Sequence, residues 1–171
     1  MKKSGKLCRL ELVSTNWAEE FPDCAKLFRR VGWFLFFEKI TCYNLEATRS
    51  FVQNCSNSCV EFQTLKIELT KELISKATGL AIEGECRFKK FPFEFDPSIF
   101  RFPGFESLDW NKGIHLSTVK PEWREVIGTV QCYITCEGRF ATMYKYHFRF
   151  LLHLNDQSKM NLPLFFFKSL I

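Results

Sequence analysis

Apolar side chains recur at helical spacing along most of the chain. Those between residues 24 and 40 follow the three-to-four-residue period of one helical face, and Pro22 just before them suits a helix start. A shorter helix is expected over residues 45–53. Thr70 has the side chain of an N-cap and Gly79 stands where a helix-ending glycine belongs, so the segment between them is also predicted to be helical.

The clearest periodicity lies in the C-terminal third. Apolar residues stand at offsets 0, 3, 4, 7 and 11 from Trp123, and the same offsets recur from Phe140 after a short joint at Gly138. We therefore expect an antiparallel helix pair over residues 121–136 and 140–154, with the ring of Trp123 in its core.

One short segment changes period. Val60 and Phe62 alternate with polar residues, and so do Leu65 and Ile67, but the two runs are out of phase by one residue. A bulge or a tight turn between the runs accounts for the phase change. The sequence therefore predicts a two-stranded β element near residues 60–69.

These elements predict a mainly α (α+β) fold, a helical domain with a helix-Gly-helix antiparallel pair and a small two-stranded β element. Residues 1–20 are expected to form a loosely ordered basic lead-in, and residues 21–171 a single helical domain. The last helix, starting near Pro163, is expected to be truncated at the C-terminus. The 20 phenylalanines stand in clusters, which favours a packed core over disorder.

Charged residues interrupt every long apolar run, which places the chain inside the cell. Glu38 and Lys39 end the best candidate for a membrane span, and no apolar stretch follows the N-terminal lysines as a secretory signal would require. We expect a protein of the nucleus or cytoplasm that does not associate with membranes. The eight cysteines are then expected to be free thiols or metal ligands rather than disulfides.

Two cysteine pairs form a candidate metal site. Each pair is separated by three residues, and four thiolates bind zinc tetrahedrally. Small thiols buried in a core give the same pattern, and we favour that interpretation because no paired histidine motif accompanies the cysteines. No cofactor is expected. The candidate ligands are Cys55, Cys59, Cys132 and Cys136.

Basic residues form a second candidate site, for nucleic acid. The net charge of +5 is concentrated towards the two ends of the chain. One cluster of cations interleaves with phenylalanines that could stack on bases, and another pair at helical spacing could meet successive phosphates. The same residues are also explained by a solvated helix face and by the anchors of a long loop. We favour these two interpretations over nucleic-acid binding. The candidate residues are Arg87, Lys89, Lys90, Arg139, Lys145 and Arg149.

Nothing in the sequence has the pattern of a catalytic site. A nucleophile needs a base beside it, and the chain has only three histidines, none joined by spacing to a cysteine or serine. The spacing of aspartates and glutamates does not match a metal-dependent nuclease or integrase. We therefore expect that the protein is not an enzyme.

Several segments resemble plant proteins of mobile-element origin, which are associated with transposons and retrotransposons. The resemblance rests on residues 120–123, 133–140, 146–152 and 161–170, and residues 65–80 are also similar to a strand–helix unit of the plant mobile domain. It implies a non-catalytic interaction module of a transposon- or retrotransposon-derived protein, which binds a protein partner or self-associates. The alternative that it leaves open is a nucleic-acid-binding domain of such a protein. It implies no catalytic residues.

Overall fold

The computed structural model describes residues 16–39, 45–56, 58–62, 64–86, 96–102, 113–136 and 141–170, and everything below concerns these residues. Of them, 62% are helical, and the strands form one three-stranded and one two-stranded sheet. The fold is therefore mainly α with a small β component, as the hydrophobic pattern predicts. The chain forms two compact units, described separately below, and our expectation of a single domain stays a prediction.

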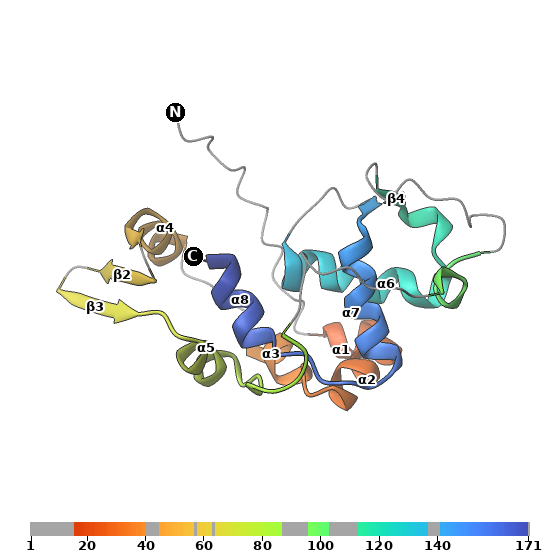
Figure 1. Ribbon diagram of the computed structural model, residues 1–171, viewed down its shortest axis with the longest axis horizontal. Coiled ribbons are helices and arrows are strands. Elements are labelled where there is room, and N and C mark those ends of the chain that lie inside the picture. Colours follow the sequence, from red (N-terminus) through yellow and green to blue (C-terminus); the bar gives the residue numbers. More distant parts are fainter. Residues whose placement is uncertain are drawn as a thin grey trace. The chain divides into compact units, whose positions relative to one another are not determined.

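One unit spans residues 12–88 and 157–171. In Figure 1 its helices run from red to olive, and the last helix is dark blue. Its elements are α1 (Trp17–Glu20), α2 (Pro22–Arg30), α3 (Phe34–Lys39), α4 (Leu45–Asn54), β1 (Cys55–Ser56), β2 (Cys59–Phe62), β3 (Leu65–Glu68), α5 (Lys71–Thr78) and α8 (Leu162–Leu170).

Two expectations for the start of this unit were wrong. Residues 17–20 form the helix α1 rather than part of a loose lead-in, and Trp17 in this helix is buried. Residues 1–15 lie outside the described residues. The helix expected over residues 24–40 is two helices. Gly32, with φ +77°, follows the end of α2, and the Trp33 N–H donates to the Phe28 carbonyl at 2.8 Å. A glycine in the left-handed region ends a helix in this way.

Four aromatic rings form the core of this unit. The ring centroids of Phe28 and Phe37 are 4.7 Å apart, and Trp17 stacks on both of them at 5.8 and 5.0 Å. Trp33, which follows the helix break at Gly32, stacks on Phe28 with its ring centroid 5.9 Å away. We call these four residues the aromatic cluster. The apolar pattern runs through the break because α2 and α3 both turn towards this cluster.

The β element contains three antiparallel strands in the order β1-β2-β3, one more than expected. Phe62 pairs with Leu65, and Val60 with Ile67, in an antiparallel hairpin. This register brings both apolar runs to the same face of the sheet, which explains the phase change in the sequence. β1 follows α4 directly and pairs with the start of β2.

Helix α5 has both caps that the sequence predicts. The Thr70 hydroxyl accepts a hydrogen bond from the Leu73 N–H at 3.0 Å, and Gly79 adopts the left-handed conformation at the other end. We expect Thr70→Ala to lower the free energy of unfolding by about 1 kcal/mol, because the Leu73 N–H loses its acceptor. Thr70→Ser keeps a hydroxyl and should retain most of the stability in denaturant titrations. Equal losses in the two variants would contradict the capping role.

The other described unit comprises residues 96–102, 113–136 and 141–156. Its elements are η1 (Pro97–Ile99), β4 (Ile114–His115), η2 (Leu116–Thr118), α6 (Pro121–Thr129), the π-helix η3 (Val130–Thr135), β5 (Thr142–Met143) and α7 (Lys145–Asn155). Figure 1 shows α6 and α7 in cyan and blue.

Helices α6 and α7 pack against each other, as predicted for the helix pair, but two details differ. The second helix begins at Lys145 rather than at residue 140, because Thr142 and Met143 pair with β4 instead. Gly138, in the predicted joint, lies outside the described residues. Trp123 is half-buried rather than central, and it stacks edge-to-face on the fully buried ring of Phe100 at 4.8 Å.

Candidate functional site

The basic residues singled out in the sequence do not form a described cationic surface. Arg87, Lys89, Lys90 and Arg139 lie outside the described residues. Lys145 is the first residue of α7 and is half-buried.

Arg149 was expected on a solvated face of α7, and that placement is wrong. Its exposed fraction is only 7%, and both Phe148 and Phe150 beside it are buried as well. Apolar side chains of α7 are buried on more than one side of the helix, so spacing from Lys145 did not reveal which side faces solvent. A buried guanidinium cannot reach an external phosphate unless the surrounding side chains move.

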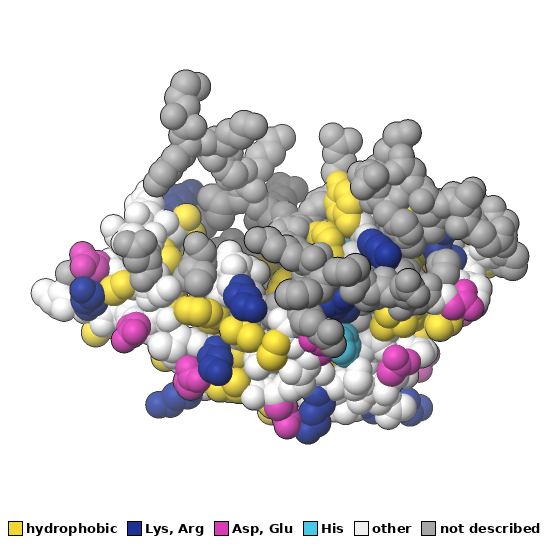
Figure 2. All heavy atoms as spheres, in the orientation of Figure 1, with side chains coloured by type: hydrophobic (Ala, Val, Ile, Leu, Met, Phe, Trp, Pro, Cys, Tyr) yellow, Lys and Arg dark blue, Asp and Glu magenta, His cyan; other side chains and the backbone are white. Residues whose placement is uncertain are grey.

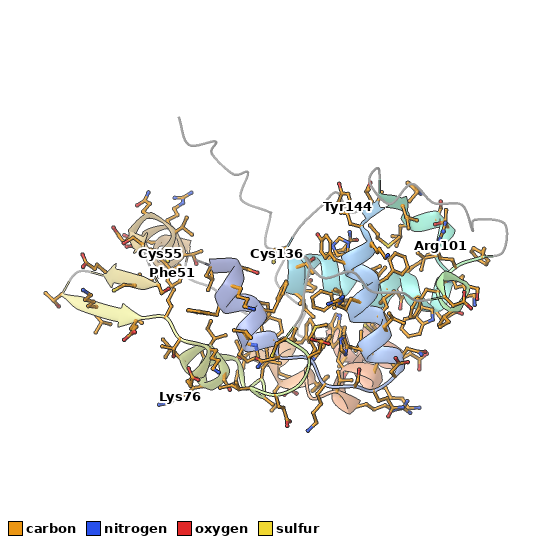
Figure 3. All side chains as sticks on the ribbon, in the orientation of Figure 1. Phe51, Cys55, Lys76, Arg101, Cys136 and Tyr144 are labelled. Atoms are coloured by element: carbon orange, nitrogen blue, oxygen red, sulfur yellow. The ribbon has the colours of Figure 1, made fainter. Side chains whose placement is uncertain are left out.

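The sheet register separates the first cysteine pair. Cys55 pairs with Val60, whereas Cys59 is the neighbour of Val60 along β2. Because successive side chains of a strand point to opposite faces, Cys55 and Cys59 lie on opposite faces of the sheet. Figure 3 shows Cys55 beside Phe51, where α4 ends and β1 begins. This pair therefore does not converge on one metal ion.

The second cysteine pair lies at the end of the π-helix. The Cys136 thiol donates to the Cys132 carbonyl at 3.4 Å, within the same turn of the chain. Cys136 itself has left-handed backbone angles, with φ 49°. Across the described ranges, no group of three or more histidine, cysteine, aspartate or glutamate side chains is arranged to hold a metal ion. None of the six cysteines in those ranges forms a disulfide.

The π-helix carries two buried polar side chains that the sequence analysis did not single out. Gln131 donates through Nε2 to the Thr142 carbonyl at 2.8 Å and so ties the π-helix to β5. Gln131 Oε1 and Thr135 Oγ1 are buried without a hydrogen-bond partner. A π-turn is not visible in the sequence; the available signal was a polar residue beside an apolar stripe. π-turns often occur at functional sites, but here the contacts show only a structural link between the π-helix and β5.

One small hollow lies in the first unit. Its volume is about 20 Å³, which is the room of a single water molecule. Trp33 and Leu80 line its apolar side, and the ion pair between Lys159 and Glu83, 2.6 Å long, borders it. The hollow is too small for a substrate.

Large apolar side chains are exposed on three adjoining helices of the same unit. Leu35 on α3, Leu73 on α5 and Leu170 on α8 are all exposed. α5 packs on α8, and the Phe36 ring of α3 lies 5.3 Å from that of Phe166 on α8. Figure 2 shows hydrophobic side chains gathered over these helices. Exposed apolar area of this kind is typical of contact surfaces.

The phenylalanines of residues 88–105 contribute little to the described surface. Within residues 88–105, Phe100 is fully buried and Phe102 is exposed. The other phenylalanines of that segment lie outside the described residues. In α8, Phe165 is buried and the next two phenylalanines are half-buried.

Among the described residues, one edge of β3 pairs with no other strand. β3 is one of the two outer strands of its sheet, and in Figure 1 it lies at the outside of the hairpin. Leu65 at its start is 58% exposed, and Lys66 and Glu68 are exposed too. An edge strand presents unpaired N–H and C=O groups to other chains. This edge is the candidate functional site, and we call it the β3 edge.

Comparison with protein-family models, with curated proteins and with solved structures found no match. The resemblance to plant mobile-element proteins therefore stays a prediction. Within the described part of the chain, no helix has the length and hydropathy needed to cross a bilayer.

Proposed function

We propose that this chain is a non-catalytic interaction module that binds another protein chain through the β3 edge. The observation that carries the proposal is that one edge of β3 pairs with no described strand, while Leu65 at the start of β3 is exposed. A partner strand added there gains backbone hydrogen bonds, and contacts to alternate side chains give specificity. We also place the module, on the sequence resemblance, in a protein derived from a plant transposon or retrotransposon.

The buried state of Arg149 supports a protein partner over nucleic acid. A phosphate-binding surface needs cations that reach solvent. Arg149, which was predicted to bind phosphate together with Lys145, does not reach solvent. The β3 edge carries one cation and one anion, Lys66 and Glu68, rather than a surface of one sign. The β3 edge would therefore attract a polyanion at Lys66 and repel the polyanion at Glu68.

A salt titration tests the function directly. We expect random DNA or RNA to bind negligibly at physiological salt in mobility-shift assays. Tight nucleic-acid binding that weakens log-linearly with salt would overturn the proposal.

The non-catalytic part of the proposal needs an independent assay. Nuclease and strand-transfer assays with Mg²⁺ or Mn²⁺ should give no signal above background. Metal-dependent activity that a single carboxylate substitution abolishes would show an enzyme and contradict the proposal.

A further inference from the structure

The hydrogen-bond register shows which groups face outward at the β3 edge. The Leu69 N–H donates to the Ser58 carbonyl at 2.7 Å, and Val60 pairs with Ile67 in the same register. Hydrogen-bonded pairs alternate along an antiparallel ladder, so Ile67 and Leu69 turn their backbone groups towards β2. The backbone N–H and C=O groups of Lys66 and Glu68 therefore point to the free edge.

The side chains of β3 divide between the two faces of the sheet. Leu65 and Ile67 share the face of Val60, which is 1% exposed, so that face is the apolar one. Lys66 and Glu68 lie on the opposite face, and both are exposed. β3 thus has an apolar face, a charged face with one residue of each sign, and outward backbone groups on the two charged residues.

We propose that β3 pairs antiparallel with β3 of a second copy of this chain, about a two-fold axis through Ile67. Lys66 then lies opposite Glu68 of the second copy, and Glu68 opposite its Lys66. Two three-stranded sheets become one continuous sheet. This inference rests on the proposed function and names its partner.

Charge complementarity selects this register. Antiparallel pairing across the edge must align residues whose backbone groups both point outward, so the register can change only in steps of two residues. A shift of two residues in one direction places Lys66 opposite Lys66, and in the other direction Glu68 opposite Glu68. Like charges directly opposite each other destabilise a sheet, whereas opposite charges stabilise it.

The apolar face fits the same register. Ile67 lies directly opposite Ile67 of the second copy as a non-hydrogen-bonded pair, where side chains approach most closely. The exposed Leu65 lies opposite Leu69 of the second copy and gains cover there. A pairing limited to a few residues buries little area, so a weak dimer is expected, at the low end of specific interfaces.

Charge reversal tests the register. We expect Lys66→Glu or Glu68→Lys to weaken dimerisation by about 30-fold, because the two-fold axis converts two attractive pairs into two repulsive ones. The double variant Lys66→Glu/Glu68→Lys restores opposite charges in the same register and should restore the wild-type constant. Lys76→Glu makes the same change of net charge as Lys66→Glu, but at an exposed residue of α5 (Figure 3), and it should have no effect.

A proline variant tests the backbone contact. The Lys66 N–H points away from β2, so Lys66→Pro removes an edge donor without removing a hydrogen bond of the hairpin. We expect this variant to remain folded by circular dichroism and to lose the dimer. Ile67→Pro, by contrast, removes a donor to β2 and should destabilise the sheet itself.

Sedimentation equilibrium over a range of concentrations measures both series against the monomer mass of 20.2 kDa. Rescue in the double variant, together with loss in Lys66→Pro, is the expected result. A monomer at all concentrations, or single reversals that leave the constant unchanged, would overturn the second copy as partner or this register. Neither outcome alters the result of the salt titration, which tests the proposed function separately.

Discussion

Phe28→Ala is expected to lower the free energy of unfolding by about 3–5 kcal/mol. The Phe28 side chain is fully buried, and its ring contacts those of Trp17, Trp33 and Phe37. Its removal leaves a cavity among three other large rings, which cannot all move inward to fill it. Stacked aromatic pairs also contribute beyond the apolar area that they bury.

Thermal and denaturant unfolding measure this loss. In a chain of this size, each kcal/mol of lost stability lowers the melting temperature by roughly 2–4 °C, and the expected loss is about 3–5 kcal/mol. Phe102→Ala is the matched control, because it makes the same chemical change at a ring that is 40% exposed and should cost much less. Comparable losses in the two variants would show that the aromatic cluster is not the core of its unit.

Gly84→Ala is the second substitution for which a large effect is expected. Gly84 has φ +98°, and a Cβ atom there would overlap the backbone carbonyl of Lys159. The same carbonyl accepts a hydrogen bond from the Glu85 N–H at 2.9 Å, and the Asn161 N–H donates to the Glu85 carbonyl at 3.0 Å. A side chain at Gly84 must push these two segments apart, because a backbone group cannot rotate away as a flexible side chain does.

The expected loss for Gly84→Ala is about 3–5 kcal/mol, from the strain of a positive φ and the two hydrogen bonds that separation would break. Two other glycines divide this effect into its parts. Gly32 has φ +77° and open space around its Cα, so Gly32→Ala should show backbone strain alone, about 1 kcal/mol. Gly128, in α6, has open space and no positive φ, so Gly128→Ala should be neutral or slightly stabilising.

Denaturant titrations should show that Gly84→Ala is far less stable than Gly32→Ala, and that Gly32→Ala is less stable than Gly128→Ala. If Gly84→Ala matched Gly32→Ala, the close approach of residues 84–85 to residues 159–161 would not contribute to stability. That result would contradict the bridge between Glu85 and Met160 that closes the first unit.

The elements could be predicted where the signal lies within a few residues. Thr70 and Gly79 cap α5 as expected, since a hydroxyl acceptor and a left-handed backbone act on the same helical turn. The phase change between Phe62 and Leu65 also predicted a turn, and the structure shows the hairpin there. The break at Gly32 was missed because the apolar period continues through it towards one shared core.

The candidate sites could not be predicted because each depends on how elements pack or pair, which residue spacing along the chain does not show. Helical spacing placed Lys145 and Arg149 on one face but did not show that Arg149 is buried, which depends on what packs against α7. Spacing along the chain also paired Cys55 with Cys59, and only the strand register placed them on opposite faces. The free edge of β3 is likewise a property of the sheet order.

The sequence by itself determined that this protein is mainly helical, the two caps of α5, and the alternating segment near residues 60–69. These follow from side-chain period and backbone preference, which act over one or two turns of chain. Only the tertiary structure decided which faces are buried, that Gly84 lies against Lys159, and that Lys66 and Glu68 turn their backbone groups to an open edge. Those outcomes depend on which segments meet and in which register, and the spacing of apolar and polar residues encodes neither.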